Sequence, residues 1–231
     1  MAIPAREAAG GIMLSASHNP IEWNALKLLD HAGEFLSAEA GAGILQQYQD
    51  QAFQFADVRS MGGIELVANG IQEHIDAILA LELVDAEAIR SSGFVVAIDA
   101  VNSTGGLALP PLLRRLGVAD VDELNCTPNG IFPHNPEPLA EHLAEICAHI
   151  RNNPRVRLGI VVDPDVDRLA LIDENGEMFG EEYTLVAVAD YVLQHQPGPA
   201  VSNLSSSRAL ADLAQHHGQP YYASAVGEVN V

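Results

Sequence analysis

Short apolar runs alternate with amphipathic segments through most of the chain. Residues 158–163 (LGIVVD) give the strongest apolar run, and residues 94–100 (FVVAIDA) give another, so both are predicted to be buried strands. In residues 107–116, leucines recur at three- and four-residue spacing, which predicts an amphipathic helix. Strands alternating with helices indicate an α/β fold in which mixed, largely parallel sheets lie between layers of helices.

The same patterns predict the remaining elements. Strands are expected at 25–30, 118–124, 200–204 and 221–226, and helices at 70–83, 139–150, 181–193 and 206–218, with a further helix that Ser37 could cap. Glu174-Asn175-Gly176 is typical of a hairpin turn between two short strands. We divide the chain by pattern into residues 1–89, 90–178 and 179–231.

Acidic side chains dominate the charge of the chain. The sequence holds 31 Asp and Glu residues against 11 Lys and Arg residues, which gives a net charge of −20. This balance argues against a general nucleic-acid-binding or anionic membrane-binding surface. An anionic substrate would therefore need a metal ion or a local group of basic residues at its site.

The chain shows no signal for export or membrane insertion. Residues 1–11 lack a basic region followed by a long apolar stretch, and no apolar run approaches the roughly 18 residues that span a bilayer. Cys126 and Cys147 have neither metal-ligand spacing nor partners for a disulfide framework. We expect a soluble, cytoplasmic protein with reduced thiols.

Residues 15–20 (SASHNP) form the first candidate for chemistry. Ser, Asn and Pro favour turns, so a plain surface loop is one interpretation. The other is a nucleophile loop, in which the Ser17 hydroxyl lies beside His18 on a rigid turn. Adjacency in sequence alone does not pair these two side chains, because neighbouring side chains often point apart.

Residues 163–168 (DPDVDR) form the second candidate. Asp163, Asp165 and Asp167 follow an apolar strand, and an extended backbone would send all three carboxylates to one side. Such carboxylates repel one another unless a cation lies between them, and hard oxygen ligands suit Mg²⁺ or Ca²⁺. A solvated acidic turn, an EF-hand and the aspartyl loop of a haloacid-dehalogenase-type phosphatase are the competing interpretations. Arg168 stands where an EF-hand needs glycine, and the flanking segments read as strands rather than helices.

Few basic residues are available to face an anion. Lys27, Arg168 and Arg208 are the natural candidates. The polar stretch Asn102–Gly106 could cradle a phosphate at a helix start, but it lacks a Walker pattern and is more typical of a plain helix start.

Together these motifs resemble the α-D-phosphohexomutase family, which contains phosphoglucomutase, phosphomannomutase and phosphoglucosamine mutase. The family carries a T-x-S-H-N-P loop followed by N-G-x-K, and then a D-x-D-x-D-R loop. The chain has Ser15–Pro20 followed by Asn24 and Lys27, and then Asp163–Arg168, in the same order. Similarity continues through residues 97–106 (AIDAVNSTGG), 128–139 (PNGIFPHNPEPL) and 226–231 (VGEVNV). Ser15 replaces the usual Thr, and Ala25 replaces the usual Gly.

The resemblance implies a reaction and a set of roles. Ser17 would be the phosphorylated serine that exchanges a phosphoryl group with a hexose 1- or 6-phosphate through a hexose 1,6-bisphosphate, which also acts as activator. One Mg²⁺ would be held by Asp163, Asp165, Asp167 and a phosphorylated Ser17. Arg168 would contact phosphoryl oxygens, and Lys27 and His18 would be candidates for acid–base work. The phosphoglucosamine and phosphomannose branches are the most similar.

Two alternatives remain open beside the mutase. One is a Mg²⁺-dependent phosphatase with Asp163 as nucleophile, and the other is a truncated domain that binds Mg²⁺ without catalysis. The family has four domains, and the chain resembles the end of the first, the whole second and part of the third. We therefore expect a fragment that is inactive as a mutase by itself. Its expected partner is a small sugar phosphate, with neither nucleic acid nor membrane.

Overall fold

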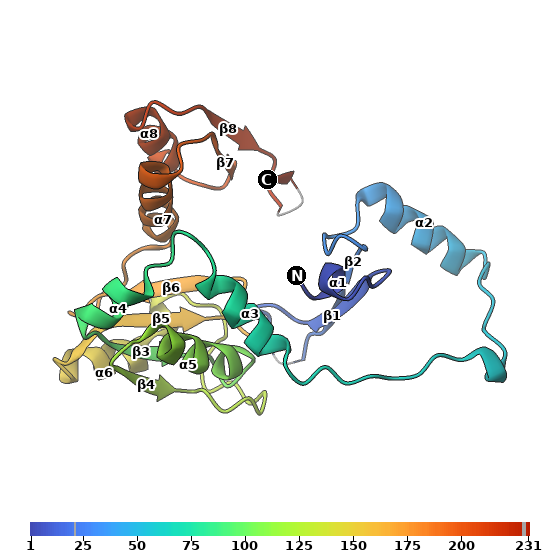
Figure 1. Cartoon of the computed structure of the whole chain (residues 1–231), viewed down its shortest axis with the longest axis horizontal. Helices are drawn as coiled ribbons and strands as arrows, with labels where there is room; N and C mark the ends of the chain where they lie inside the picture. Colours follow the sequence, from blue (N-terminus) through green and yellow to red (C-terminus); the bar gives the residue numbers. More distant parts are fainter. Residues whose placement is uncertain (21, 228–229) are drawn as a thin grey trace. The chain divides into compact units, whose positions relative to one another are not determined.

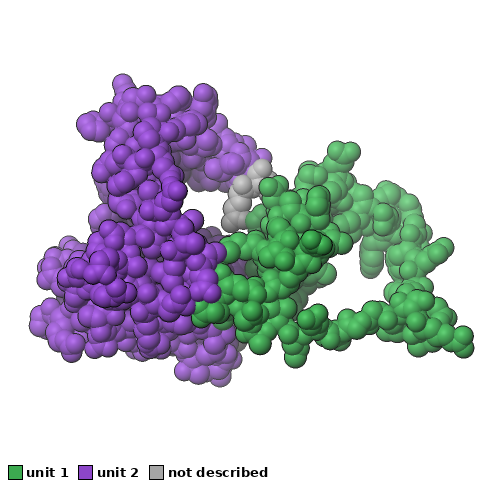
Figure 2. All heavy atoms as spheres, in the orientation of Figure 1, with its two compact units in different colours: residues 1–14, 26–74 green, residues 15–25, 75–231 purple. Residues whose placement is uncertain are grey.

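The computed structural model of the chain describes residues 1–20, 22–227 and 230–231. It divides into two compact units (Figure 2): unit 1 holds residues 1–14 and 26–74, and unit 2 holds residues 15–25 and 75–231. Among the described residues, no helix is both long enough and apolar enough to cross a membrane.

A four-stranded sheet forms the centre of unit 2. Its strands are β3 (Val95–Asp99), β4 (Asp120–Leu124), β5 (Val156–Val162) and β6 (Leu169–Ile172), in the order β4-β3-β5-β6 (Figure 1). β3 pairs in parallel with both β4 and β5, whereas β6 runs antiparallel to β5. The predicted mixed, largely parallel sheet is thereby confirmed.

Helices cover both faces of this sheet, and the side-chain alternation of β3 shows how. Val95 and Ala97 belong to a buried cluster that includes residues of α6 (Ala144–Asn152). Val96 and Ile98 belong to the opposite cluster, which includes Leu113 of α5 (Gly105–Leu116). Because successive strand residues point to opposite faces, β3 contributes to both layers and is buried along its whole length.

Two glycines allow α5 to begin close to the sheet. A Cβ on Gly105 would lie 2.6 Å from Val162 Cγ2, and a Cβ on Gly106 would overlap the backbone carbonyl of Cys126. Any larger residue here would push the start of α5 away from the ends of the central strands.

From residue 70 onward, the remaining elements except α4 follow the predicted order. They are α3 (Gly70–Leu79), α4 (Ala86–Ser92), η2 (Ala140–His142), α7 (Glu181–His195), β7 (Ala200–Asn203), α8 (Ala209–His216) and β8 (Tyr221–Ser224). β7 and β8 pair in parallel as a separate two-stranded sheet. α4, with Gly93 as its left-handed C-cap, has no counterpart among the predicted elements.

The helix expected over residues 139–150 is wrong in one respect. It is broken at Leu143, whose φ of −102° and ψ of 20° separate η2 from α6. The Leu143 side chain is buried in the cluster beneath α6. Packing of this residue against the sheet therefore overrides the continuous helical pattern.

Unit 1 contains short elements. They are α1 (Ala2–Ala5), β1 (Gly11–Ser15), β2 (Ala25–Leu29), α2 (Ala38–Gln49) and η1 (Val58–Ser60), with β1 and β2 paired and each contributing one terminal residue to unit 2. Ser37 caps α2 as predicted, because its side chain accepts a hydrogen bond from Ala40 N at 3.1 Å. None of the described residues of unit 1 is buried.

Candidate active site and metal loop

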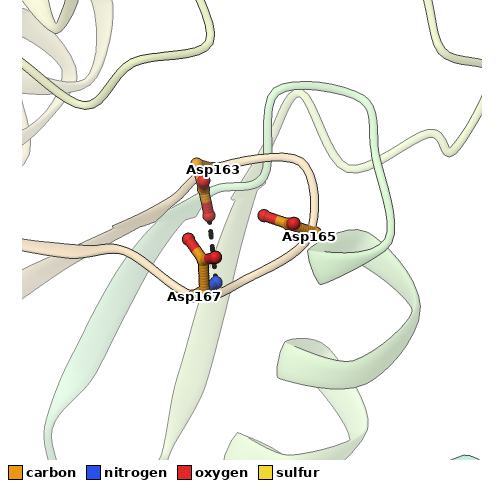
Figure 3. A group of neighbouring side chains, drawn as sticks. All are labelled: Asp163, Asp165 and Asp167. Carbon is orange, nitrogen blue, oxygen red and sulfur yellow. Dashed lines mark hydrogen bonds between the residues drawn. The ribbon is translucent and has the colours of Figure 1, made fainter. Parts of the chain in front are cut away.

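The three aspartates of the DPDVDR motif converge in the turn between β5 and β6. One carboxylate oxygen of each lies within 4.8 Å of the others (Figure 3). The three carboxylates converge for a different reason than predicted, because the backbone of this segment is not extended. Val166 N donates to Asp163 O at 3.2 Å, and Val166 has a φ of +64°, so a tight turn gathers the carboxylates.

Asp163 is the most buried of the three. Its side chain is 0 % exposed, and its Oδ1 accepts hydrogen bonds from Asp167 N at 3.1 Å and Arg168 N at 3.2 Å. Its Oδ2 is also buried and accepts no hydrogen bond from the described part of the chain. Burial raises the pKa of this carboxyl to about 7.

These features fit a divalent cation. A buried carboxylate oxygen without a donor costs free energy that a bound cation would remove. Three carboxylates supply the hard oxygen ligands that Mg²⁺ prefers. A calcium-binding EF-hand does not fit, because the loop joins two strands rather than two helices.

The start of α5 contacts residues 163–168, the candidate metal loop, from one side. Ser103 Oγ and Thr104 Oγ1 both donate to the carbonyl oxygen of Pro164, at 2.9 and 2.6 Å. The Asn102–Gly106 stretch thus serves as a helix start whose hydroxyls bind the neighbouring loop. This contact fixes the turn that carries the three aspartates.

The serine loop, residues 15–20, contacts the candidate metal loop through Ser15. Ser15 Oγ donates to Asp165 Oδ2 at 2.5 Å and accepts from Ser17 N at 2.8 Å. The two motifs, 150 positions apart at these residues, are therefore joined by direct hydrogen bonds. Ser15 keeps the hydroxyl of the family's threonine, and only this hydroxyl is needed for the link.

Ser17 and His18 do contact each other. Ser17 Oγ lies 3.1 Å from His18 Nδ1, and Ser17 has a φ of +52°, a left-handed conformation that is uncommon for serine. His18 Nε2 in turn lies 3.3 Å from Arg168 Nη2. Arg168 Nη1 donates to Glu137 Oε1 at 2.7 Å. A pocket of about 380 Å³ lies beside this group, lined by Glu137, Pro138, Leu139, Arg168 and Leu169.

Two segments of the chain match models of known protein families, and each segment contains one of the two loops. A family described as "Phosphoglucomutase/phosphomannomutase, alpha/beta/alpha domain I" matches residues 1–55, and its "alpha/beta/alpha domain II" matches residues 72–176. The chain belongs to the α-D-phosphohexomutase family.

Curated members of the family align along nearly the whole chain. A "Phosphoglucomutase/phosphomannomutase" of Thermococcus kodakarensis is 35 % identical over 97 % of this chain and 48 % of its own length. A "Probable phosphoglucosamine mutase" of Methanopyrus kandleri is 29 % identical over 96 % of this chain and 48 % of its own length. The chain thus spans about half the length of these phosphohexomutases.

A solved phosphohexomutase structure has the same fold. The "putative phosphomannomutase" from Thermus thermophilus superposes with a TM-score of 0.82 at 26 % identity, over 98 % of this chain and 51 % of that one.

The roles predicted for the other residues stay predictions. Lys27 lies on β2 and belongs to unit 1, whereas Ser17, His18 and the metal loop belong to unit 2, so a catalytic role for Lys27 stays a prediction. Arg208 forms an ion pair with Asp212 at 3.3 Å, at the start of α8. The VGEVNV segment includes residues 228 and 229, which lie outside the described residues. The domain boundaries at 90 and 178 also remain predictions.

Sequence reasoning missed Glu137 and the residues that fix its loop. Residues 128–139 resemble the family, but no residue in that stretch stands out by type. A carboxylate is also not the group expected beside an arginine that is predicted to contact phosphoryl oxygens. One feature of the sequence could have pointed to an acidic partner for Arg168. The chain has few basic residues, and a half-buried arginine in an acidic chain needs an acidic partner.

Proposed function

We propose that this chain carries the phosphoryl-transfer half of a phosphohexomutase active site. Ser17 accepts a phosphoryl group from, and returns it to, the 1- or 6-position of a hexose phosphate, with a hexose 1,6-bisphosphate as intermediate and activator. The supporting observation is the hydrogen-bonded junction of the serine loop with the aspartate loop, at Ser15 and Asp165.

The roles follow from what each group can do. Phosphoryl transfer needs in-line positioning and neutralisation of charge more than covalent chemistry from the protein. Arg168 has five N–H donors, of which two are directed to Glu137 and His18, so others remain for phosphoryl oxygens. The Ser15–Ser17 hydrogen bond orients the loop that presents the Ser17 hydroxyl. His18 contacts that hydroxyl directly.

Asp163, Asp165 and Asp167 would hold the Mg²⁺, with an oxygen of phosphorylated Ser17 as a further ligand. Bound there, the ion supplies positive charge that stabilises the transferring phosphoryl group. The three side chains are of the right type and lie close enough together to share one ion.

The sugar phosphate is the proposed partner. The pocket beside Arg168, at about 380 Å³, lies in the range of small-molecule sites. Which hexose is preferred is a property of residues that read the sugar hydroxyls, and the phosphoglucosamine, phosphomannose and phosphoglucose forms share the chemistry proposed here.

The phosphatase alternative has less support. An aspartyl nucleophile must reach phosphorus, but the Asp163 side chain is 0 % exposed, and its Oδ1 is occupied by two backbone N–H groups. Asp163 is therefore better placed as a metal ligand than as a nucleophile.

The test is the site of covalent phosphate after incubation with Mg²⁺ and glucose 1,6-bisphosphate. We expect phosphopeptide mass spectrometry to find phosphate on Ser17, and Ser17→Ala to abolish it. Ser60→Ala is the matched control, because Ser60 is an exposed serine of η1 and its loss should leave labelling unchanged.

The other outcomes separate the alternatives. Phosphate on Asp163 would favour the phosphatase. Intact Mg²⁺ binding without any covalent phosphate would favour a non-catalytic metal-binding module.

A further inference from the structure

We propose that Glu137 is a positioning residue that acts through Arg168 to fix the tautomer of His18, so that His18 Nδ1–H donates a hydrogen bond to Ser17 Oγ. The inference rests on the proposed function for its relevance to phosphoryl transfer, but the hydrogen-bond chain itself stands on the contacts of unit 2.

The direction of each hydrogen bond in the chain follows from the donor inventory. A guanidinium has only donors, so the 3.3 Å contact from Arg168 Nη2 requires His18 Nε2 to be an acceptor. A neutral imidazole that accepts at Nε2 carries its proton on Nδ1. That proton is then available to Ser17 Oγ at 3.1 Å, and the serine oxygen accepts.

A protonated His18 fits the contacts poorly. Its Nε2–H would face the Arg168 guanidinium, which is itself a cation. The nearest acidic oxygen, Glu137 Oε1, lies 3.9 Å from His18 Nε2, beyond hydrogen-bond distance. The neutral form with the proton on Nδ1 therefore satisfies more groups.

Glu137 decides where Arg168 points. The 2.7 Å bond between Arg168 Nη1 and Glu137 Oε1 is charge-assisted, and the two side chains are 40 % and 31 % exposed. A free arginine on this acidic chain could turn toward other carboxylates. With Glu137 in place, Arg168 is held with Nη2 directed at His18.

The loop that carries Glu137 is itself anchored. His134 Nε2 lies 3.1 Å from Oδ2 of the buried Asp99, and His134 Nδ1 lies 2.8 Å from Asn135 O. Both partners are acceptors, so both ring nitrogens carry protons, and the hydrogen bond to Asp99 raises the pKa of His134. Glu137 N then donates to Asn135 Oδ1 at 3.0 Å. Glu137 is thereby tied to the end of β3.

The arrangement gives the serine oxygen a fixed donor. When the phosphoryl group passes from Ser17 to a sugar hydroxyl, the bond from phosphorus to Oγ breaks as the bond to the sugar oxygen forms, and the proton that the sugar hydroxyl loses restores the hydroxyl of Ser17. A donor already aimed at Oγ stabilises the negative charge that develops there during the transfer. Glu137 touches neither the serine nor the phosphoryl group, so it positions the residues that do.

The experiment is nitrogen NMR of the histidine rings in the full chain, labelled with ¹⁵N and free of phosphoryl donor. His18 signals are assigned by their loss in His18→Gln. We expect wild-type His18 to show a protonated Nδ1 and an unprotonated Nε2. In Glu137→Gln we expect Nε2 to become partly protonated.

Two further variants test whether the effect is specific to Glu137. Glu141→Gln removes the same charge from an exposed side chain four positions away and should leave the His18 signals unchanged. If Glu137→Gln fails to fold, as judged by its amide spectrum, Arg168→Met tests the same chain and should shift the His18 tautomer in the same way. A wild-type His18 protonated on Nε2, or a tautomer unaffected by Glu137→Gln, would overturn the inference.

A second readout separates the inference from the proposed function. In Glu137→Gln the rate of Ser17 labelling should fall on the order of tenfold while Mg²⁺ affinity stays the same. If no variant accepts phosphate but the tautomers behave as expected, the proposed function fails and the hydrogen-bond chain stands. Equal labelling rates in Glu137→Gln and wild type would remove the positioning role.

Discussion

Unit 2 and unit 1 differ most in what they bury. Unit 2 holds all of the buried residues in the described part of the chain, including both clusters against the central sheet. In unit 1, Ile12, Leu14 and Leu26 remain 59–72 % exposed along paired strands. The candidate site lies on the unit with the core, because a fixed geometry of small distances needs side chains that cannot move.

The pKa values of one carboxyl group in each unit are shifted in opposite directions. In unit 1, hydrogen bonds from the backbone N–H groups, led by Glu34, lower the pKa of Asp30. In unit 2, burial raises the pKa of Asp163 to about 7. Backbone donors thus favour the charged form of Asp30, whereas burial disfavours the charged form of Asp163.

The largest expected effect on stability comes from truncating one large apolar residue in each unit and comparing the two losses. Ile98 is 0 % exposed on β3, so Ile98→Ala should lower the unfolding free energy of unit 2 by about 2–5 kcal/mol. Leu45 on α2 is 62 % exposed, and Leu45→Ala should change stability by no more than about 0.5 kcal/mol. Hydrogen exchange of the β3 and β5 amides measures both. Similar losses for the two variants would mean that α2 has a packing partner that matters as much as the core.

A pair of glycines gives a smaller and sharper test. Gly106→Ala should destabilise unit 2 by about 1–3 kcal/mol, because the new methyl group overlaps the Cys126 carbonyl. Gly41→Ala adds a methyl group with no heavy atom within 4 Å, and should stabilise α2 by up to about 1 kcal/mol. Urea denaturation followed by helical circular dichroism, with exchange of α2 amides, distinguishes them. A neutral Gly106→Ala would show that α5 can shift without loss.

The smallest effect concerns the pH dependence of metal binding. Metal-free Asp163 carries a proton below about pH 7, and Mg²⁺ must displace it, so affinity should fall about tenfold per pH unit below that value and level off above it. Tenfold corresponds to about 1.4 kcal/mol. Titration calorimetry in buffers of different ionisation enthalpy should register proton release on the acid side only.

Two variants make the titration specific. Asp30→Asn should leave the pH profile intact, since Asp30 is already ionised in this range. Asp163→Asn should weaken binding and abolish the proton release. A profile that stays flat one unit to either side of pH 7 would place the titrating group elsewhere.

Much of the central sheet could be predicted from sequence because its signals are local. The apolar runs at 94–100 and 158–163 became β3 and β5, since a strand buried on both faces has few polar positions. The break at Leu143 could not be predicted, because it depends on packing against the sheet rather than on the helical pattern.

The candidate site divides in the same way. Asp163, Asp165 and Asp167 are close in sequence, and their convergence was expected, although a tight turn rather than an extended backbone produces it. Glu137 reaches Arg168 across 31 positions, and no local pattern records that distance. Contacts between loops depend on strand order, which the sequence specifies only through the whole fold.

The carboxyl ends of the two central parallel strands carry one further consequence. Asp99 closes β3 and Asp163 follows β5, and both are buried, at 1 % and 0 % exposure. His134 supplies a counter-charge to Asp99 from within the chain, whereas the proposed counter-charge of Asp163 comes from solution. Free Mg²⁺ would then be a thermodynamic component of the folded state, contributing about 2.7 kcal/mol when its concentration is 100 times the dissociation constant. The resistance of the sheet to unfolding would be set in part by the metal buffer around it.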